Sequence, residues 1–225
     1  MIPPHQSAAF VWRREAVVDL YEEPYDEKRP VVCFDERPCQ LLADVREPLA
    51  PRPGGPGGGV RLVDHEYRRG GTANAHVSFE PLTGWRRVEV TEKRRKQEFA
   101  EEVGRLAEED YPDAEKIRLV VDNLSTHTAS AFYEAFPAEQ ARRPARRVEF
   151  VYTPVDGSWL NMAEIEISAL VRQCLKRRLP DEETLRREAR AWAAERDRLG
   201  ASVQWRFTTE DARIRLGSLY PAEKH

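Results

Sequence analysis

The sequence predicts an α/β domain in which helices cover both faces of a mixed central sheet. Three observations lead to this fold class. Short apolar runs at residues 29–36 and 117–123 are typical of buried strands, and alternation at 76–79 and 87–90 is typical of an antiparallel hairpin. Helical patterns lie between and after these segments, as in a layered α/β domain. A chain of 225 residues is long enough to bury such a core without disulfide or metal staples.

The first part of the chain contains a helix, a strand and a loop. Residues 8–21 are expected to form an amphipathic helix, because their apolar side chains fall near one face. Pro24 and Pro30 break the chain, and the run RPVVCFDE then indicates a buried strand that ends in two carboxylates. The Gly- and Pro-rich stretch at 48–59 suits neither a strand nor a helix and is expected to be a surface loop.

Helices are expected at 93–110, 129–136 and 158–178, the last of them ended by Pro180. The basic segment RRPARR at 142–147 is expected to be a loop. It precedes a further strand, VEFVYTP.

The end of the chain is expected to be helical. Asp181 is well placed to cap a helix that runs towards Leu199, because its carboxylate can accept the free N–H groups of the first turn. Thr208 or Thr209 is expected to start the last helix.

Composition limits the classes of protein. With 40% hydrophobic and 33% charged residues the chain is expected to be soluble and globular, and no apolar run approaches the roughly 18 to 20 residues that span a bilayer. We find no secretory signal at the start, and the three cysteines form neither a zinc pattern nor a disulfide framework. The net charge of −3 excludes a chain held to nucleic acid by bulk positive charge, but not one with a local basic groove.

Three carboxylates on separate predicted elements form a candidate site. Asp35 and Asp122 each end an apolar strand, where open α/β sheets bind ligands, and Glu164 lies on an apolar helix face. Glu166 is flanked by apolar residues of the same helix in almost the same way, so helical periodicity does not choose between Glu164 and Glu166 as the third acid. Three carboxylates that meet would prefer Mg²⁺ or Mn²⁺, and two such ions about 4 Å apart can drive phosphoryl transfer. In the alternative, the two aspartates cap local structure and Glu164 points to solvent.

Five segments of the chain resemble the catalytic region of bacterial insertion-sequence transposases: DERPCQL, DHEYRRGGTANAHVSFEPLTGWRRVEVT, LVVDNLSTH, YTPVDGSWLNMAEIE and WRFTTEDARIRLGSLYP. These transposases belong to the Tc/mariner-like superfamily, and the resemblance runs from about residue 2 to residue 221. It implies a ribonuclease H-like fold with a DDE catalytic triad and a C-terminal helical extension. The corresponding domains are a linker with a helix at 1–29, the catalytic domain at 30–179 and the extension packed on it at 180–225.

By the same resemblance, the catalytic and metal-binding triad is Asp35, Asp122 and Glu164, since Glu164 rather than Glu166 matches the third acid. The resemblance implies two Mg²⁺ or Mn²⁺ ions, cleavage of phosphodiester bonds at transposon ends, and attack of the freed 3′ hydroxyl on target DNA. The implied partners are DNA and a second copy of the chain in the active complex, with no membrane. The implied location is the cytoplasm of a bacterium, on the nucleoid when the protein is bound to DNA.

Other polar residues lie close to the triad in the sequence. Those that could orient ligands or phosphates are Glu36, Asn123, His127 and Asn161. His127 could equally be a histidine at a helix start that is bonded locally.

Basic residues beyond Glu164 on the same helix are candidates to bind DNA phosphates, with a solvated helix face as the alternative. They are Arg172, Lys176, Arg177 and Arg178. Two further basic clusters, at 93–96 and 142–147, allow the same two interpretations.

The chain departs from the family pattern in two ways. It begins at what resembles the linker after the helix-turn-helix region that recognises inverted repeats, so we expect one product of a split element or a truncated gene. The spacing from Asp122 to Glu164 is longer than is common, and we place the extra length around 138–147. The alternatives to an active transposase are an inactive remnant and a non-catalytic regulator that pairs with a full-length transposase.

Overall fold

The computed structural model describes residues 7–46, 65–217 and 220, so the loop expected at 48–59 lies outside the described residues. The elements, in chain order, are α1 (Ala8–Glu22), β1 (Val31–Asp44), β2 (Tyr67–Phe79), β3 (Arg86–Thr91), α2 (Lys96–Arg105), the π-helical turn η1 (Leu106–Asp110), β4 (Ile117–Val121), α3 (Ser130–Ala135), α4 (Ala138–Arg147), β5 (Val148–Tyr152), the 3₁₀ turn η2 (Ser158–Leu160), α5 (Ala163–Leu170), the π-helical turn η3 (Val171–Leu175), α6 (Glu182–Arg198) and α7 (Thr209–Arg215). None of the described helices is long and apolar enough to cross a membrane.

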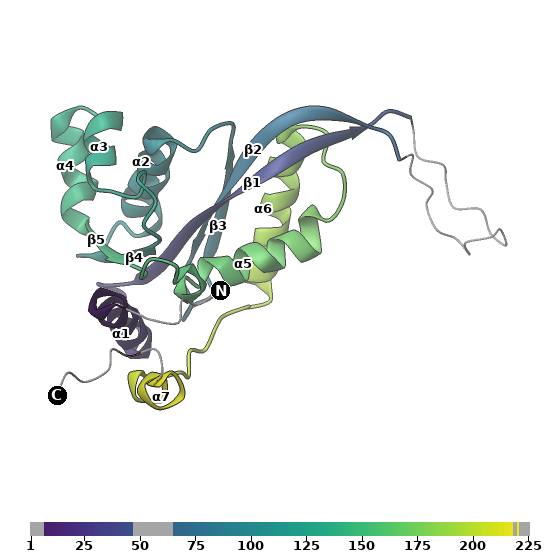
Figure 1. Cartoon of the computed structure of the whole chain (residues 1–225). Helices are drawn as coiled ribbons and strands as arrows, with labels where there is room; N and C mark the ends of the chain where they lie inside the picture. The colour runs from purple at the N-terminus through teal and green to yellow at the C-terminus, as the bar shows by residue number, and fades with distance from the viewer. Residues whose placement is uncertain (1–6, 47–64, 218–219, 221–225) are drawn as a thin grey trace.

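The described strands form one mixed sheet in the order β3-β2-β1-β4-β5 (Figure 1). β2 pairs antiparallel with β1 and with β3, which confirms the predicted hairpin, whereas β1, β4 and β5 run parallel. In the register of the two central strands, Cys33 lies opposite Val120. This register determines which side chains of β1 lie opposite those of β4 and of the residues that follow it.

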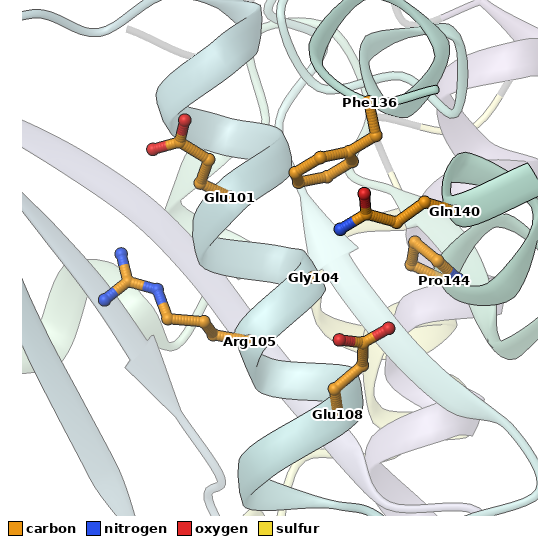
Figure 2. Close-up of a pocket in the computed structure, with 7 residues that line it drawn as sticks. All are labelled: Glu101, Gly104, Arg105, Glu108, Phe136, Gln140 and Pro144. Atoms are coloured by element: carbon orange, nitrogen blue, oxygen red, sulfur yellow. The ribbon is translucent and has the colours of Figure 1, made fainter. Parts of the chain in front are cut away.

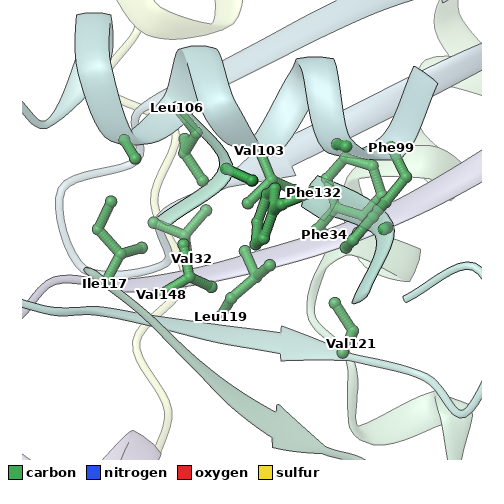
Figure 3. Packing of buried hydrophobic residues seen from close by; sticks show 14 of the residues in the cluster. Val32, Phe34, Phe99, Val103, Leu106, Ile117, Leu119, Val121, Phe132 and Val148 are labelled. Atoms are coloured by element: carbon green, nitrogen blue, oxygen red, sulfur yellow. The ribbon is translucent and has the colours of Figure 1, made fainter. Parts of the chain in front are cut away.

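Alternate side chains of the central strands enter two different cores. Val32 and Phe34 belong to the cluster under α2, η1, α3 and α4, which Figure 3 shows from close by. Cys33 and Val120 face the opposite side, in a cluster with residues of α1 and with Leu160. Helices lie on both sides of the sheet (Figure 1). Burial on both faces explains the nearly continuous apolar runs of β1 and β4, and the predicted α/β fold class is confirmed.

Strand β1 is longer than its apolar run predicts. It continues past Asp35 and Glu36 to Asp44, so these two carboxylates lie within the strand and not at its end. Its second half pairs with β2 in an antiparallel ribbon that projects from the sheet (Figure 1), and Leu41 in this half packs in the core cluster that includes residues of α6. The apolar run stops at Phe34 because the ribbon is mostly only partly buried, and its pairing depends on β2.

The segment 142–147 forms the second half of α4, so the prediction of a basic loop was wrong. Ala141 and Pro144, three residues apart, are buried on one face of this helix. Packing of that face stabilises the helix, although proline removes one backbone N–H and is unfavourable at an interior position.

The helix expected at 158–178 is shorter at both ends. Residues 158–160 form the 3₁₀ turn η2, Asn161 is extended, and the α-helix begins at Ala163. The Asn161 side chain accepts the N–H of Ala163 at 3.1 Å, which stabilises this later start. The last turn, η3, ends at Leu175.

Helices α6 and α7 begin where the sequence predicts. The Asp181 carboxylate accepts the N–H of Thr184 at 2.7 Å, and the Thr208 hydroxyl accepts the N–H of Asp211 at 3.0 Å. Helix α6 packs on β3 and α7 packs on α1. The division of the chain at residues 29 and 179 stays a prediction.

Candidate active site

The three predicted carboxylates line one cavity of about 430 Å³. Asp35 lies within β1, Asp122 follows the last residue of β4, and Glu164 lies in the first turn of α5. Because Cys33 is opposite Val120, residues 35 and 122, each two positions further along, fall opposite each other on the same face of the sheet. The fold thus brings together three acids that are far apart in the sequence.

The two aspartates differ in pKa because their surroundings differ. Burial, together with three nearby carboxylates, raises the pKa of Asp35 to about 7 against the opposing effect of the Glu36 N–H, which donates to it at 2.8 Å. A hydrogen bond from His127 lowers the pKa of Asp122. The cavity therefore concentrates negative charge around a partly buried carboxyl group, which a bound cation would neutralise.

His127 links two of the predicted residues. Its Nδ1 lies 2.7 Å from Oδ1 of Asp122, and its Nε2 lies 3.1 Å from Oε2 of Glu36. Burial opposes a charged imidazole, but the hydrogen bonds to both carboxylates raise the pKa of His127 to about 9. His127 is therefore a buried cation that orients both acids, through one contact that is local in sequence and one that crosses to β1.

Asn161 fixes the backbone beside the cavity. Its side chain is fully buried, and its Nδ2 donates to the Phe34 carbonyl oxygen at 2.8 Å. Since its Oδ1 also accepts the N–H of Ala163, the residue connects β1, next to Asp35, to the start of α5. Its contacts hold the two elements that carry Asp35 and Glu164.

Asn123 and three arginines complete the surroundings. The Asn123 side chain accepts a hydrogen bond from Arg13 of α1, which connects this helix to the end of β4. Nη1 of Arg94 lies 3.8 Å from Oε1 of Glu36, and Arg37 lines the cavity. Arg94 belongs to a basic cluster noted in the sequence, whereas no sequence signal marked Arg13 or Arg37, whose neighbours come from distant segments.

Glu164 and Glu166, which periodicity cannot separate, lie in different environments. Glu164 is partly exposed and lines the cavity. Glu166 is fully buried, with its carboxylate 3.1 Å from Nε of Arg86 and 2.8 Å from Nη2 of Arg196. Only Glu164 is available to a ligand in the cavity.

A second cavity, of about 300 Å³, lies between α2 and the α3–α4 pair (Figure 2). Gly104, Phe136 and Pro144 form its apolar part, and Glu101 and Gln140 are among its polar lining residues. None of the predicted site residues lines it.

A protein-family profile described as DDE superfamily endonuclease matches residues 30–186, more than half of the chain. The chain belongs to the DDE superfamily of endonucleases. No curated protein matches this DDE superfamily endonuclease.

Solved structures of Mos1 transposase share the fold of this DDE endonuclease. The mariner Mos1 paired-end complex with Mg aligns with a TM-score of 0.59 and 16% identity, over 99% of this chain and 66% of the Mos1 chain. The Mos1 strand transfer complex aligns with a TM-score of 0.54 and 14% identity, over 99% and 66%. The paired-end complex with Mn aligns with a TM-score of 0.54 and 15% identity, over 89% and 61%. The chain thus spans less than two thirds of the Mos1 length, and the likeness confirms the predicted ribonuclease H-like fold.

The carboxylates of this DDE endonuclease suit a divalent metal in kind. Asp35, Asp122 and Glu164 supply the hard oxygen ligands that Mg²⁺ and Mn²⁺ prefer, around a carboxyl group whose pKa is raised by burial and like charge. Their spacing does not by itself form a metal site: in the described part of the chain, no three His, Cys, Asp or Glu side chains lie close enough together to hold an ion.

The four basic DNA-contact candidates of the DDE endonuclease differ in placement. Arg172 lines the carboxylate cavity and donates to the Ser168 hydroxyl. Lys176 is exposed, whereas Arg177 is paired with Glu188. Nη1 of Arg178 lies 2.7 Å from Oδ1 of Asp44. The charges of Arg177 and Arg178 are therefore already balanced, and Arg172 is the candidate that the structure places at the site.

Proposed function

We propose that this DDE superfamily endonuclease is a transposase-type catalytic domain that cleaves phosphodiester bonds at transposon ends and joins the freed 3′ hydroxyl to target DNA. The observation that carries the proposal is the meeting of Asp35, Asp122 and Glu164 at one cavity of the DDE fold. The likeness to paired-end and strand transfer complexes of Mos1 supports it.

In this proposal Asp35, Asp122 and Glu164 are the residues that would hold two Mg²⁺ or Mn²⁺ ions. Such ions, when bound, activate an attacking oxygen and stabilise a leaving one. His127 keeps the Asp122 carboxylate ionised and oriented through its 2.7 Å contact. Asn161 keeps β1 and α5, and with them two of the three acids, in a fixed relation.

The proposed partners are DNA and a second copy of the chain. Arg172 and Arg37, which line the cavity beside the acids, are placed to contact phosphates. The net charge of −3 supplies no bulk attraction, so we expect the chain alone to bind DNA weakly and to release it readily with added salt.

A second candidate function is a non-catalytic domain that binds DNA or a full-length transposase. The observation that favours it is the spacing of the carboxylates, since no three acidic, histidine or cysteine side chains in the described residues are close enough to hold an ion. The two candidates differ in whether the protein breaks a phosphodiester bond.

Nicking of DNA by the purified chain tests the proposal. A supercoiled plasmid that carries the ends of the element would be incubated with Mn²⁺, with Mg²⁺ or with a chelator. Asp122→Asn removes one carboxylate charge at the cavity, whereas Asp113→Asn removes an exposed one elsewhere and serves as the matched control. We expect metal-dependent nicking that falls to background in Asp122→Asn and is unchanged in Asp113→Asn. DNA binding without nicking by the wild type would favour the non-catalytic domain.

A further inference from the structure

Helix α5, with its extension η3, presents two opposite faces. The side chains that line the carboxylate cavity are spaced as one helical stripe: Glu164, Ile167, Ser168, Val171 and Arg172. Since an α-helix turns about 100° per residue, Glu166 lies about 200° from Glu164, on the far side of the helix. The buried residues Ala169, Leu170 and Cys174 lie in the core between this helix, the sheet and α6.

The far face contains a buried ion cluster. Glu166 and Arg86 both have fully buried side chains, and Nε of Arg86 lies 3.1 Å from Oε2 of Glu166. Arg196 of α6 donates to both oxygens of the same carboxylate, from Nε at 3.1 Å and from Nη2 at 2.8 Å. Nη1 of Arg86 also lies 3.3 Å from Oδ1 of Asp197. Two arginines and two acids from β3, α5 and α6 thus balance one another.

Such a cluster fixes the rotation of α5 about its axis. A charge that loses its partner inside a protein is strongly destabilising, because it has no water to solvate it. Any rotation that turned Glu164 away from the cavity would withdraw Glu166 from Arg86 and Arg196. Helix α6 also holds the last turn, since Nε1 of Trp192 donates to Oε1 of Gln173 at 2.8 Å.

We propose that Glu166, held by Arg86 and Arg196, is a positioning residue that directs Glu164 into the carboxylate cavity. Helix α6 then helps to orient Glu164 through Arg196, although it contributes no lining residue to the cavity. The inference rests on the proposed function for the role of Glu164, but not for the geometry of the helix.

The test compares two arginines of α6 that each pair with a glutamate. Arg196→Met breaks the buried cluster, and Arg190→Met breaks an exposed pair between α6 and Glu89 of β3. Leu185→Ala, at a buried position of α6 itself, controls for a general loss of stability. Two quantities are measured: the Kd for Mn²⁺ without DNA, by calorimetry, and the amide hydrogen exchange of residues 163–170.

We expect Arg196→Met to raise the Kd for Mn²⁺ by about 10-fold or more, as for loss of a residue that orients a metal ligand, and to speed amide exchange in 163–170. Arg190→Met and Leu185→Ala should leave the Kd within about twofold of the wild type. If Arg196→Met folds poorly, Arg196→Lys keeps the charge, loses the two-point contact, and should show the same effects at reduced size.

Wild-type exchange in 163–170 for both Arg196 variants would overturn the inference, whatever the protein's activity. Equal Kd values for Arg196→Met and Arg190→Met would also overturn it. A wild type that neither binds Mn²⁺ nor nicks DNA would instead contradict the proposed function, and the exchange rates would still decide whether the cluster positions α5.

Discussion

Asn161, between η2 and α5, donates its Nδ2 hydrogen to the carbonyl oxygen of Phe34 in β1 at a distance of 2.8 Å. We predict that Asn161→Ala lowers the free energy of unfolding by about 2 kcal/mol, because it leaves a buried carbonyl oxygen and the N–H of Ala163 without this partner. Urea unfolding measures the change. Gln140→Ala, at an exposed position of α4, is the control, and an equal effect in both variants would contradict the prediction.

Arg172 is predicted to contact DNA, and Arg177 is not. Arg172 lines the carboxylate cavity, whereas the guanidinium of Arg177 is paired with Glu188. Arg172→Met should weaken DNA binding and reduce the slope of log K against log salt by about 0.9, since one phosphate contact is lost. Arg177→Met should leave the slope unchanged. Fluorescence anisotropy with a labelled duplex at several KCl concentrations measures both, and a smaller slope in the Arg177 variant alone would show that the assignment is reversed.

Arg147 is predicted to stabilise the fold and not to bind DNA. Its guanidinium donates to the carbonyl oxygens of Ala107, Tyr111, Pro112 and Ala114, and so connects α4 to the segment after α2. Arg147→Met should lower the free energy of unfolding by at least about 3 kcal/mol, because several carbonyl groups lose their donor.

The neighbouring Arg146 provides the matched control for Arg147. Its side chain is exposed and makes no hydrogen bond or ion pair with the described part of the chain. Arg146→Met should change stability by less than about 0.5 kcal/mol in the same thermal or urea unfolding experiment. Equal losses in the two variants would indicate a general effect of charge on α4.

Glu102 is predicted to make stability depend on pH. Burial raises the pKa of this carboxyl from 4.5 to about 7. The positive charges of Arg105 and Arg87 lower the pKa but do not cancel this shift, and the negative charges of Glu89 and Glu101 raise it further. Because the folded state binds this proton more tightly, the contribution to stability is complete below the unfolded pKa and is lost as pH rises through about 7.

Glu102→Gln cannot ionise and should not show this loss. Relative to the wild type, the variant should become more stable by up to about 3 kcal/mol between pH 4.5 and pH 8. Urea unfolding of both proteins at several pH values measures the difference. A difference that stays constant over this range would show that Glu102 is ionised throughout in the folded state.

Much of the fold follows from signals that are local in the sequence. Asp181 and Thr208 start helices because a cap needs only the N–H groups of the next turn. The apolar runs before Asp35 and Asp122 predict buried strands because both faces of a central parallel strand are covered. The prediction of a loop at 142–147 was wrong because the stability of helix α4 comes from packing against other elements, which buries Ala141 and Pro144.

The sequence by itself determined the α/β class, the family and the three candidate acids. Helical periodicity could not separate Glu164 from Glu166, and the family resemblance chose Glu164. Only the tertiary structure gave the physical reason, because the difference lies in their partners. Glu166 is buried against Arg86 of β3 and Arg196 of α6, both distant in the chain, while Glu164 faces the cavity opposite. Helical periodicity indicates only that both residues lie on a largely apolar helix. The cost of burying a charge depends on which groups the fold places next to it.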